Sequence, residues 1–411
     1  MPNQVLLEKY AKLIVETGVN VQPDQRLVIR GTTEAKELIR EITKAAYNVG
    51  SKQVHVLWSD DYVAHDTAQN VALDVLKNIP EYLIAQYQYF VDEEACFVSL
   101  TSPIPGLNAD LDAKKQQQVE IATQQKLSFF RAHTMGNKVP WVVAAAPNLI
   151  WAEAVFPKLK GSEALEALWS AVFAACRVNL SSNPTLNWKE HNKNLTAHNQ
   201  VLNNYNFKSL HFKNSIGTDV TIELVENHIW AGGIETAQTG VKFNPNLPTE
   251  ETFTMPHKFG TNGKIVSSKP LNYQGKLIND FWLEFKDGKV IDFDAKEEKA
   301  ALESLLNFDE GARYLGEVAL ISHNTPISET NIVFLNTLFD ENASCHVALG
   351  RAYPMNIKDG NDTPMEELLK KGYNNSMTHV DFMFGSSDME IIGTTQDGKK
   401  IQVFKAGNFV I

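Results

Sequence analysis

The sequence predicts an α/β protein built from two domains, an N-terminal open α/β sheet domain over residues 1–195 and a strand-rich α+β domain over residues 196–411. Three observations support this fold class. The chain has 411 residues, which is enough for more than one hydrophobic core. Strand-length apolar runs alternate with helical patterns in the first half, which is typical of a mostly parallel sheet covered by helices. Closely spaced strand patterns joined by turns dominate the second half.

The first half contains apolar runs of strand length and segments of helical periodicity. Strands are expected at residues 26–31, 53–58, 96–100 and 141–144, and helices at residues 6–17, 34–48, 68–78 and 163–177. Gly18 stops the first helical pattern and Gly50 closes the second. Ser162 precedes the last pattern and is a good N-cap residue.

The character of the chain changes near Pro184. A polar amphipathic segment over residues 186–202 is interpreted as a helix that connects the domains. Strand patterns beyond it are expected to pair across turns, at residues 210–213 with 220–225, 281–286 with 289–293, and 318–321 with 331–334. The dipeptide Asp287-Gly288 is a strong hairpin signal. Helices are expected at residues 297–306 and 365–371.

Composition excludes several classes of protein. The net charge of −11 and the pI near 5.5 disfavour contact with a phosphate backbone, so we expect no nucleic-acid partner. The N-terminus lacks the basic head and apolar block of a signal peptide, and no apolar run is long enough to span a bilayer. The three cysteines are widely separated and odd in number, which argues against a disulfide scaffold. We therefore expect a cytoplasmic protein with no membrane partner.

Carboxylates and imidazoles gather in the second half, where strand-like runs meet turns. The candidate ligands are Glu250, Glu251, Glu317, Glu341, His346, His379 and Asp381. Segments at such junctions can bring together residues that are distant in the sequence. This set of donors suits one or two borderline divalent ions such as zinc, cobalt or manganese.

Each candidate also has a plainer interpretation. His379 and Asp381 are two residues apart, so in a strand they share a face, but so short a match also fits an ordinary surface strand. A single imidazole such as His346 is more often a satisfied core or turn residue than a ligand. Cys345 is expected to be a small buried hydrophobe and not a nucleophile, because adjacent residues on a strand face opposite ways.

Counting charges favours two cations. Glu251, Glu317, Glu341 and Asp381 would carry four negative charges, which match two divalent ions, with the two histidines as neutral ligands. Paired ions of this kind acidify a bridging water and polarise a bound carbonyl group.

Two further functions need residues of their own. A nearby glutamate would carry a proton to the leaving amine. Tyr353 is a candidate hydrogen-bond donor to the oxyanion, although the plainer interpretation is that its ring packs against Pro354.

Short motifs of other enzyme classes are absent from the sequence: it has no H-E-x-x-H helix, no G-x-S-x-G elbow, no P-loop and no convincing G-x-G-x-x-G turn. Another two-metal hydrolase, acting on a phosphoester or a different amide, remains an alternative. Arg351 is the one basic residue in the densest motif, which gives little support to a phosphate clamp. A non-catalytic, metal-stabilised peptide-binding protein is a third interpretation, but structural zinc sites prefer closed Cys/His shells.

Taken together, the acidic and histidine-bearing segments resemble one family, the aminopeptidase T and aminopeptidase S metallopeptidases. The matching segments are Asn246–Pro256, Asp309–Arg313, Leu315–Leu320, Asn336–Pro354 and His379–Gly385, in the same order along most of the chain. One departure is Thr252, where the family often has valine; both residues are β-branched.

The resemblance implies a dinuclear metal-dependent exopeptidase that removes N-terminal amino acids from peptides and works as a homodimer. The strand-rich domain would then be the metal-binding catalytic domain. Carried over motif by motif, the metal ligands fall on Glu251, Glu317, His346, His379 and Asp381. Glu341 would be a further ligand or the base, Glu250 the alternative base, and Tyr353 the residue that assists the transition state.

Overall fold

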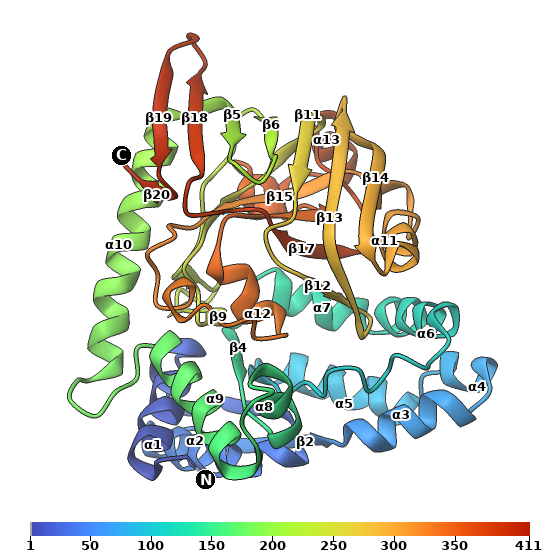
Figure 1. Ribbon diagram of the computed structural model, residues 1–411. Coiled ribbons are helices and arrows are strands. Elements are labelled where there is room, and N and C mark those ends of the chain that lie inside the picture. Colours follow the sequence, from blue (N-terminus) through green and yellow to red (C-terminus); the bar gives the residue numbers. More distant parts are fainter. Residues whose placement is uncertain (1) are drawn as a thin grey trace. The chain divides into compact units, whose positions relative to one another are not determined.

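The computed structural model describes residues 2–411, and the chain forms two compact units (Figure 1). The first unit comprises the chain up to Asn192 together with Ile234–Pro248, and the second comprises Lys193–Gly233 and Thr249–Ile411. Residues 234–248 therefore return to the first unit after the chain has entered the second. The division into domains at residue 195 stays a prediction, because compactness alone does not show that either unit folds by itself.

The first unit contains a parallel sheet in the order β2-β1-β3-β4-β9. Its strands are β1 (Arg26–Thr32), β2 (Gln53–Ser59), β3 (Cys96–Thr101), β4 (Trp141–Ala145) and β9 (Asn246–Leu247). The strands predicted in the first half are confirmed, and each ends one residue later than expected. Three consecutive residues of β1, Leu27 to Ile29, are fully buried, as expected for a strand of a parallel sheet that is covered on both faces.

Helices make up most of the remaining first unit. They are α1 (Gln4–Leu13), a π-helical turn (Ile14–Gly18), α2 (Lys36–Asn48), α3 (Asp61–Asn70), α4 (Leu73–Lys77), α5 (Glu81–Asp92), α6 (Ala113–Lys126), α7 (Ser128–Met135), α8 (Leu149–Val155) and α9 (Gly161–Ala175), with a small hairpin of β7 (Glu235–Thr236) and β8 (Lys242–Phe243).

Two details predicted for these helices were wrong. A single helix over residues 68–78 does not form, because Val71 is extended and separates α3 from α4. Ser162 is not the N-cap of α9 but lies inside the helix. The backbone N–H of Gly161, at the helix start, instead donates to Glu153 Oε1 over 2.9 Å, so a glutamate from α8 satisfies this N–H.

The second unit begins within α10 (Pro184–Tyr205), the expected connecting helix, and is rich in antiparallel strands. Its large sheet contains β5 (Phe207–Lys213), β6 (Asp219–Leu224), β11 (Pro256–Val266), β12 (Leu271–Tyr273), β13 (Lys276–Lys286), β14 (Lys289–Glu297), β18 (Glu390–Thr395), β19 (Lys400–Lys405) and β20 (Asn408–Phe409). Its helices are α11 (Lys299–Leu306), α12 (Thr337–Asp340) and α13 (Met365–Lys370).

The hairpin predicted around Asp287-Gly288 is confirmed as β13–β14. Both turn residues have positive φ, and a Cβ on Gly288 would collide with the backbone of Lys258 and Phe259, so this turn requires glycine. The hairpin of β5 and β6 is also confirmed. The pairing expected between residues 318–321 and 331–334 is wrong, because residues 331–334 form no strand and the Phe334 N–H donates to the Asp340 carboxylate instead.

A smaller antiparallel sheet of the second unit runs in the order β10-β15-β16-β17. Its strands are β10 (Thr252–Thr254), β15 (Leu315–Leu320), β16 (His346–Gly350) and β17 (His379–Met383). One face packs into the main hydrophobic core through Val318, Val347 and Phe382, all fully buried. Over residues 2–411, every helix is too short or too polar to traverse a lipid bilayer.

These features confirm the predicted fold class, a parallel α/β sheet followed by a strand-rich α+β region.

Candidate metal centre

The smaller sheet presents polar side chains on the face opposite the core. Glu317, His346, His379 and Asp381 each alternate along their strands with core residues, so the period of two places all four on one face. The strand register aligns Glu317 and Asp381 in one row, with Ala348 between them. Because alanine is small, the row leaves room between the two carboxylates.

A β-bulge directs Glu317 into this site. The register between β15 and β16 shifts between Leu315 and Glu317. At Gly316 the backbone passes so close to the carbonyl oxygens of Gly350 and Arg351 that a Cβ would collide with them. A bulge of this kind re-aims the side chain that follows it. Glycine at position 316 is therefore a structural condition for the position of Glu317.

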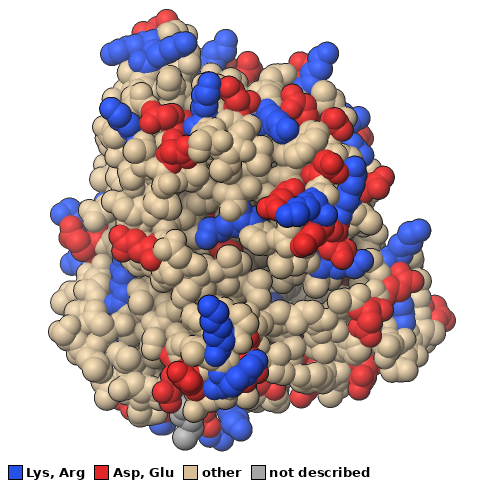
Figure 2. All heavy atoms as spheres, in the orientation of Figure 1, with Lys and Arg blue, Asp and Glu red and all other residues tan. Residues whose placement is uncertain are grey.

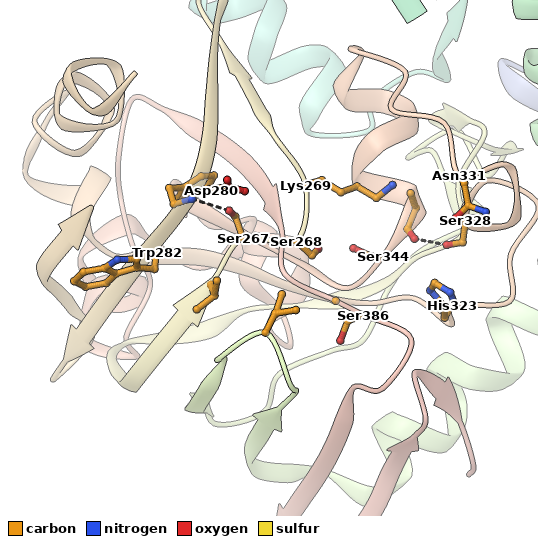
Figure 3. Close-up of a pocket in the computed structure, with 15 residues that line it drawn as sticks. Ser267, Ser268, Lys269, Asp280, Trp282, His323, Ser328, Asn331, Ser344 and Ser386 are labelled. Atoms are coloured by element: carbon orange, nitrogen blue, oxygen red, sulfur yellow. Dashed lines mark hydrogen bonds between the residues drawn. The ribbon is translucent and has the colours of Figure 1, made fainter. Parts of the chain in front are cut away.

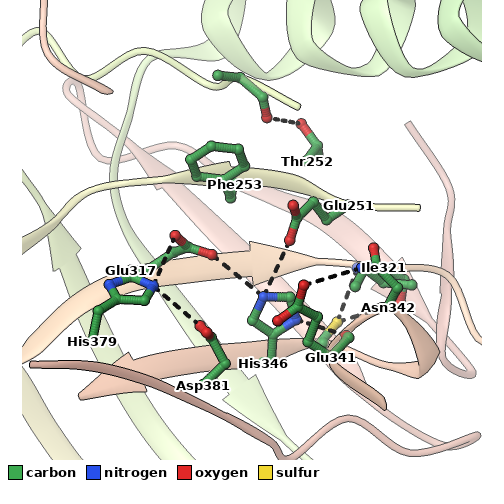
Figure 4. Close-up of polar contacts among 12 residues, drawn as sticks. Glu251, Thr252, Phe253, Glu317, Ile321, Glu341, Asn342, His346, His379 and Asp381 are labelled. Carbon is green, nitrogen blue, oxygen red and sulfur yellow. Dashed lines mark hydrogen bonds and ion pairs between the residues drawn. The ribbon is translucent and has the colours of Figure 1, made fainter. Parts of the chain in front are cut away.

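Strands β15, β16 and β17 and the residue before β10 bring five ligand candidates together (Figure 4). Nε2 of His346 lies 3.2 Å from Glu251 Oε2 and 3.3 Å from Glu317 Oε1. Nε2 of His379 lies 3.7 Å from Glu317 Oε2 and 3.4 Å from Asp381 Oδ1. These contacts form two groups, Glu251–Glu317–His346 and Glu317–His379–Asp381, each with ligand atoms within 4.8 Å of one another. Glu317 belongs to both groups and contributes a different oxygen to each histidine.

Both imidazoles are oriented from behind by backbone carbonyls. Nδ1 of His346 lies 2.8 Å from the carbonyl oxygen of Glu341, and Nδ1 of His379 lies 2.7 Å from that of Arg351. A carbonyl only accepts, so each Nδ1 carries a proton, and in the neutral form of either ring the Nε2 lone pair points at the carboxylates. A lone pair facing carboxylate oxygens at hydrogen-bond distance is unfavourable unless a proton or a cation lies between them.

The electrostatics of the cluster also indicate a missing positive charge. Burial raises the pKa of Glu317, which means that its negative charge is poorly stabilised there. Burial lowers the pKa of His379, but Asp381 and Glu317 more than reverse this and raise it to about 9. Asp381 Oδ1 is buried, and its one polar contact among residues 2–411 is the 3.4 Å ion-pair contact with His379 Nε2. The cluster therefore attracts positive charge, and its oxygen and imidazole donors fit a divalent cation.

The other predicted site residues lie near these groups but belong to neither. The Glu341 carboxylate accepts a 3.4 Å hydrogen bond from Asn342, and burial together with Asp381 and Glu251 raises its pKa well above the usual value. The Tyr353 ring lies 4.8 Å from the His379 ring, measured between centroids. Glu250 is buried, and its backbone N–H donates to Asn342 Oδ1 over 2.7 Å. The catalytic functions assigned to these residues stay predictions.

Cys345 directly precedes β16 and packs into the main hydrophobic core. It is buried, its sulfur accepts a hydrogen bond from the Ile321 N–H over 3.4 Å, and burial raises the pKa of its thiol to about 11. These features are those of a buried structural residue and not of a nucleophile.

Two groups that hold the site residues in place were not predicted from the sequence. Asn342 is fully buried and links the Glu250 backbone to the Glu341 side chain; its place beside Glu341 in the densest motif was the available signal. The carbonyl of Arg351 orients His379, and no sequence pattern marks a backbone carbonyl for this purpose.

Two relatives that are similar in sequence to this chain over nearly its whole length are aminopeptidases. The chain is 43% identical to aminopeptidase 2 of Geobacillus stearothermophilus over 403 residues, which cover 98% of this chain and 97% of the relative. It is 41% identical to aminopeptidase AmpS of Bacillus subtilis over 403 residues, covering 98% of each. The structure of wild-type AmpT from Thermus thermophilus aligns with a TM-score of 0.92 at 33% identity and covers 99% of this chain and 100% of that one.

A second solved structure, a 2,5-dihydroxypyridine dioxygenase from Pseudomonas putida KT2440, aligns with a TM-score of 0.55 at 12% identity over 98% of this chain and 96% of that one, and so shares the fold alone. The family described as thermophilic metalloprotease (M29) matches residues 3–409. The predicted resemblance is thereby confirmed, and the chain belongs to the M29 family of thermophilic metalloproteases.

Proposed function

We propose that the protein is a metal-dependent aminopeptidase that removes the N-terminal residue of peptides, and that two divalent cations are held on either side of Glu317. The observation that carries the proposal is the shared position of Glu317, whose two oxygens each face a different histidine. When bound, a pair of such cations lowers the pKa of coordinated water and polarises a carbonyl group. Zinc, cobalt and manganese all suit this mixture of carboxylate and imidazole donors.

The ligands would divide between the two groups described above. Glu251 and His346 would hold one cation, His379 and Asp381 the other, and Glu317 would bridge them. Together with Glu341, the three ligand carboxylates would carry four negative charges, which balance the four positive charges of two divalent cations. The backbone carbonyls behind both imidazoles keep the Nε2 lone pairs directed toward the cations.

Substrate would approach from the side of His379. The His379 and Asp381 side chains are 15% and 12% exposed, whereas that of His346 is 1% exposed. Tyr353 lies against His379, where its hydroxyl can donate a hydrogen bond to an oxygen that develops negative charge. We assign Glu341 as the residue that moves a proton to the leaving amine, with Glu250 as the alternative.

We further propose a cytoplasmic homodimer that takes peptides with a free N-terminus and does not bind nucleic acid or membranes. All three cysteines are free and buried, which suits a reducing compartment. On the face shown in Figure 2, the described lysines and arginines are interspersed with acidic residues and form no continuous basic patch. Large side chains exposed around β2, α3 and α5, namely Trp58, Tyr62 and Tyr82, offer an apolar surface for a second copy.

Metal analysis combined with a substrate panel tests this function. Purified active protein is expected to contain two divalent ions per chain and to release p-nitroaniline from leucine p-nitroanilide. The N-acetylated substrate, which has the same scissile bond but no free amine, is the matched control and should not be cleaved. Activity that survives verified metal removal, or equal cleavage of the acetylated substrate, would contradict the proposal.

A further inference from the structure

A polar cavity lies in the second unit, and none of the residues of the metal centre lines it (Figure 3). Its volume is about 520 Å³, which is in the range of cavities that hold small molecules. It is bounded by the end of β11 and the residues that follow it, the middle of β13, the loop over residues 323–331, the residues before His346 and the turn that follows β17. None of the candidate metal ligands or proton carriers lines it.

Lys269 supplies a cation without a direct ion-pair partner to this cavity. Its ammonium group makes no hydrogen bond and no ion pair with any described residue, although the side chain is partly buried and Asp340 attracts it from a distance. Figure 3 shows the side chain extending toward the part of the cavity where Ser328 and Asn331 lie. The carboxylate that lines the cavity, Asp280, already pairs with Lys296 at 3.4 Å. Burial lowers the pKa of Lys269, and the attraction of Asp340 offsets this only in part.

Hydroxyl groups surround the same space. Ser268 Oγ is buried and has no hydrogen-bond partner among residues 2–411, so it can donate to a guest molecule. Ser344 and Ser386 also line the cavity, but their hydroxyl groups donate to the carbonyl of Cys345 and to the Asp388 carboxylate. Ile216 and Val266 add an apolar wall. One cation, the unpaired hydroxyl group of Ser268 and an apolar wall suit a molecule with one carboxylate and an aliphatic portion. A phosphate group, with a charge of about −2, would call for more than a single lysine.

We propose that this cavity is a binding site for a small aliphatic carboxylate of the size of an amino acid or dipeptide, held by Lys269 and Ser268. The site adjoins the segment that leads to the metal centre. Ala343 and Ser344 line the cavity, Ser328 Oγ donates a hydrogen bond to the carbonyl of Ala343, and His346 follows two residues after Ser344. A bound molecule would therefore contact the segment that places Glu341 and His346.

Calorimetric titration of the full-length, metal-loaded protein with N-acetyl-L-leucine tests the proposal. The blocked amine keeps this probe from acting as an aminopeptidase substrate, so the result does not depend on hydrolysis. We expect binding to wild type, and binding at least about tenfold weaker to Lys269→Met, which keeps the aliphatic stem but removes the charge. Lys289→Met, at an exposed position outside the cavity, is the matched control and should bind like wild type.

Three results would overturn the proposal: no binding to wild type, equal binding to wild type and Lys269→Met, or equal binding of N-acetyl-L-leucinamide, which lacks the carboxylate. Tighter binding of inorganic phosphate than of N-acetyl-L-leucine would also overturn it, because the site would then recognise a different anion. If Lys269→Met does not fold, crystals of wild type soaked with N-acetyl-L-leucine decide. Density with its carboxylate on Lys269 supports the site, and density elsewhere or none refutes it.

Discussion

The rings of Tyr353 and His379 lie 4.8 Å apart between centroids at an interplanar angle of 49°, so the phenol is held beside the more exposed of the two ligand groups. The Phe253 ring also packs against the tyrosine, edge to face, with 6.3 Å between ring centroids. These two ring contacts restrict the tyrosine side chain, which is a condition for a phenol that must donate to one position.

Tyr353→Phe keeps the ring and its packing but removes the hydroxyl. If the phenol stabilises the oxyanion, kcat should fall about 10²- to 10³-fold. The bound metal content should not change, because the phenol is not expected to ligate. Steady-state kinetics with leucine p-nitroanilide and metal analysis of the same preparation check both points. A variant with wild-type kcat would mean that Tyr353 has only a packing function.

Glu251→Gln and Glu317→Gln separate the two proposed cations. Glu251 belongs to one group, so its variant should lose one metal equivalent per chain, whereas Glu317 belongs to both, so its variant should lose two. Glu303→Gln, on the exposed side of α11, is the matched control and should keep full metal content. Equal losses from the Glu251 and Glu317 variants would argue against a bridging position for Glu317.

Metal removal should lower the thermal stability of the protein. Without cations, Glu251, Glu317 and Asp381 repel each other in a poorly hydrated site, and the folded state loses the free energy of metal binding. We expect the melting temperature to fall by at least about 5 °C after chelation and to recover when zinc or cobalt is added. An unchanged melting curve, with metal loss verified by elemental analysis, would contradict the paired-cation arrangement.

Cys345 should be dispensable for catalysis although it adjoins His346. Its thiol is buried, bonded to Ile321 and shifted to a pKa of about 11, so little thiolate exists at neutral pH. Cys345→Ala should keep kcat/KM within about threefold of wild type. Iodoacetamide should modify the native protein much more slowly than the urea-unfolded protein, as measured by mass spectrometry. Rapid inactivation that maps to Cys345 would revive the nucleophile hypothesis.

The sequence predicted the ligand residues of the site better than the contacts that bring them together. The two-residue spacing of His379 and Asp381 predicts a shared face, since strand geometry is local. Joining that face to Glu317 required the bulge at Gly316 and the row through Ala348, which depend on contacts between distant segments. The resemblance to a family supplied this connection where spacing could not.

The errors in the fold have a similar origin. Residues 331–334 are apolar enough for a strand, but Asn331 and Leu335 adopt positive φ and Asp340 accepts the Phe334 N–H. Turn chemistry that depends on a carboxylate six residues later overrides the local strand pattern.

His228 provides a test of stability against pH that is independent of the metal centre. It is 6% exposed, its Nδ1 lies 3.1 Å from the carbonyl oxygen of Val225, and its Nε2 has no partner among residues 2–411. Burial lowers its pKa, whereas the backbone hydrogen bond opposes this only in part. The folded protein therefore keeps the ring neutral at pH values where the unfolded chain, with a histidine pKa of about 6.5, binds a proton.

Because the unfolded state binds more protons below about pH 6.5, His228 should lower stability as the pH falls through that value toward its folded-state pKa, and should contribute no change above it. His228→Asn keeps a donor for the Val225 carbonyl but cannot be protonated in this range. The melting temperature of wild type should thus fall more than that of the variant between pH 7.5 and pH 5.5. Scanning calorimetry of both proteins at the two pH values measures this difference. Other groups titrate equally in both proteins, so parallel losses would show that His228 does not contribute.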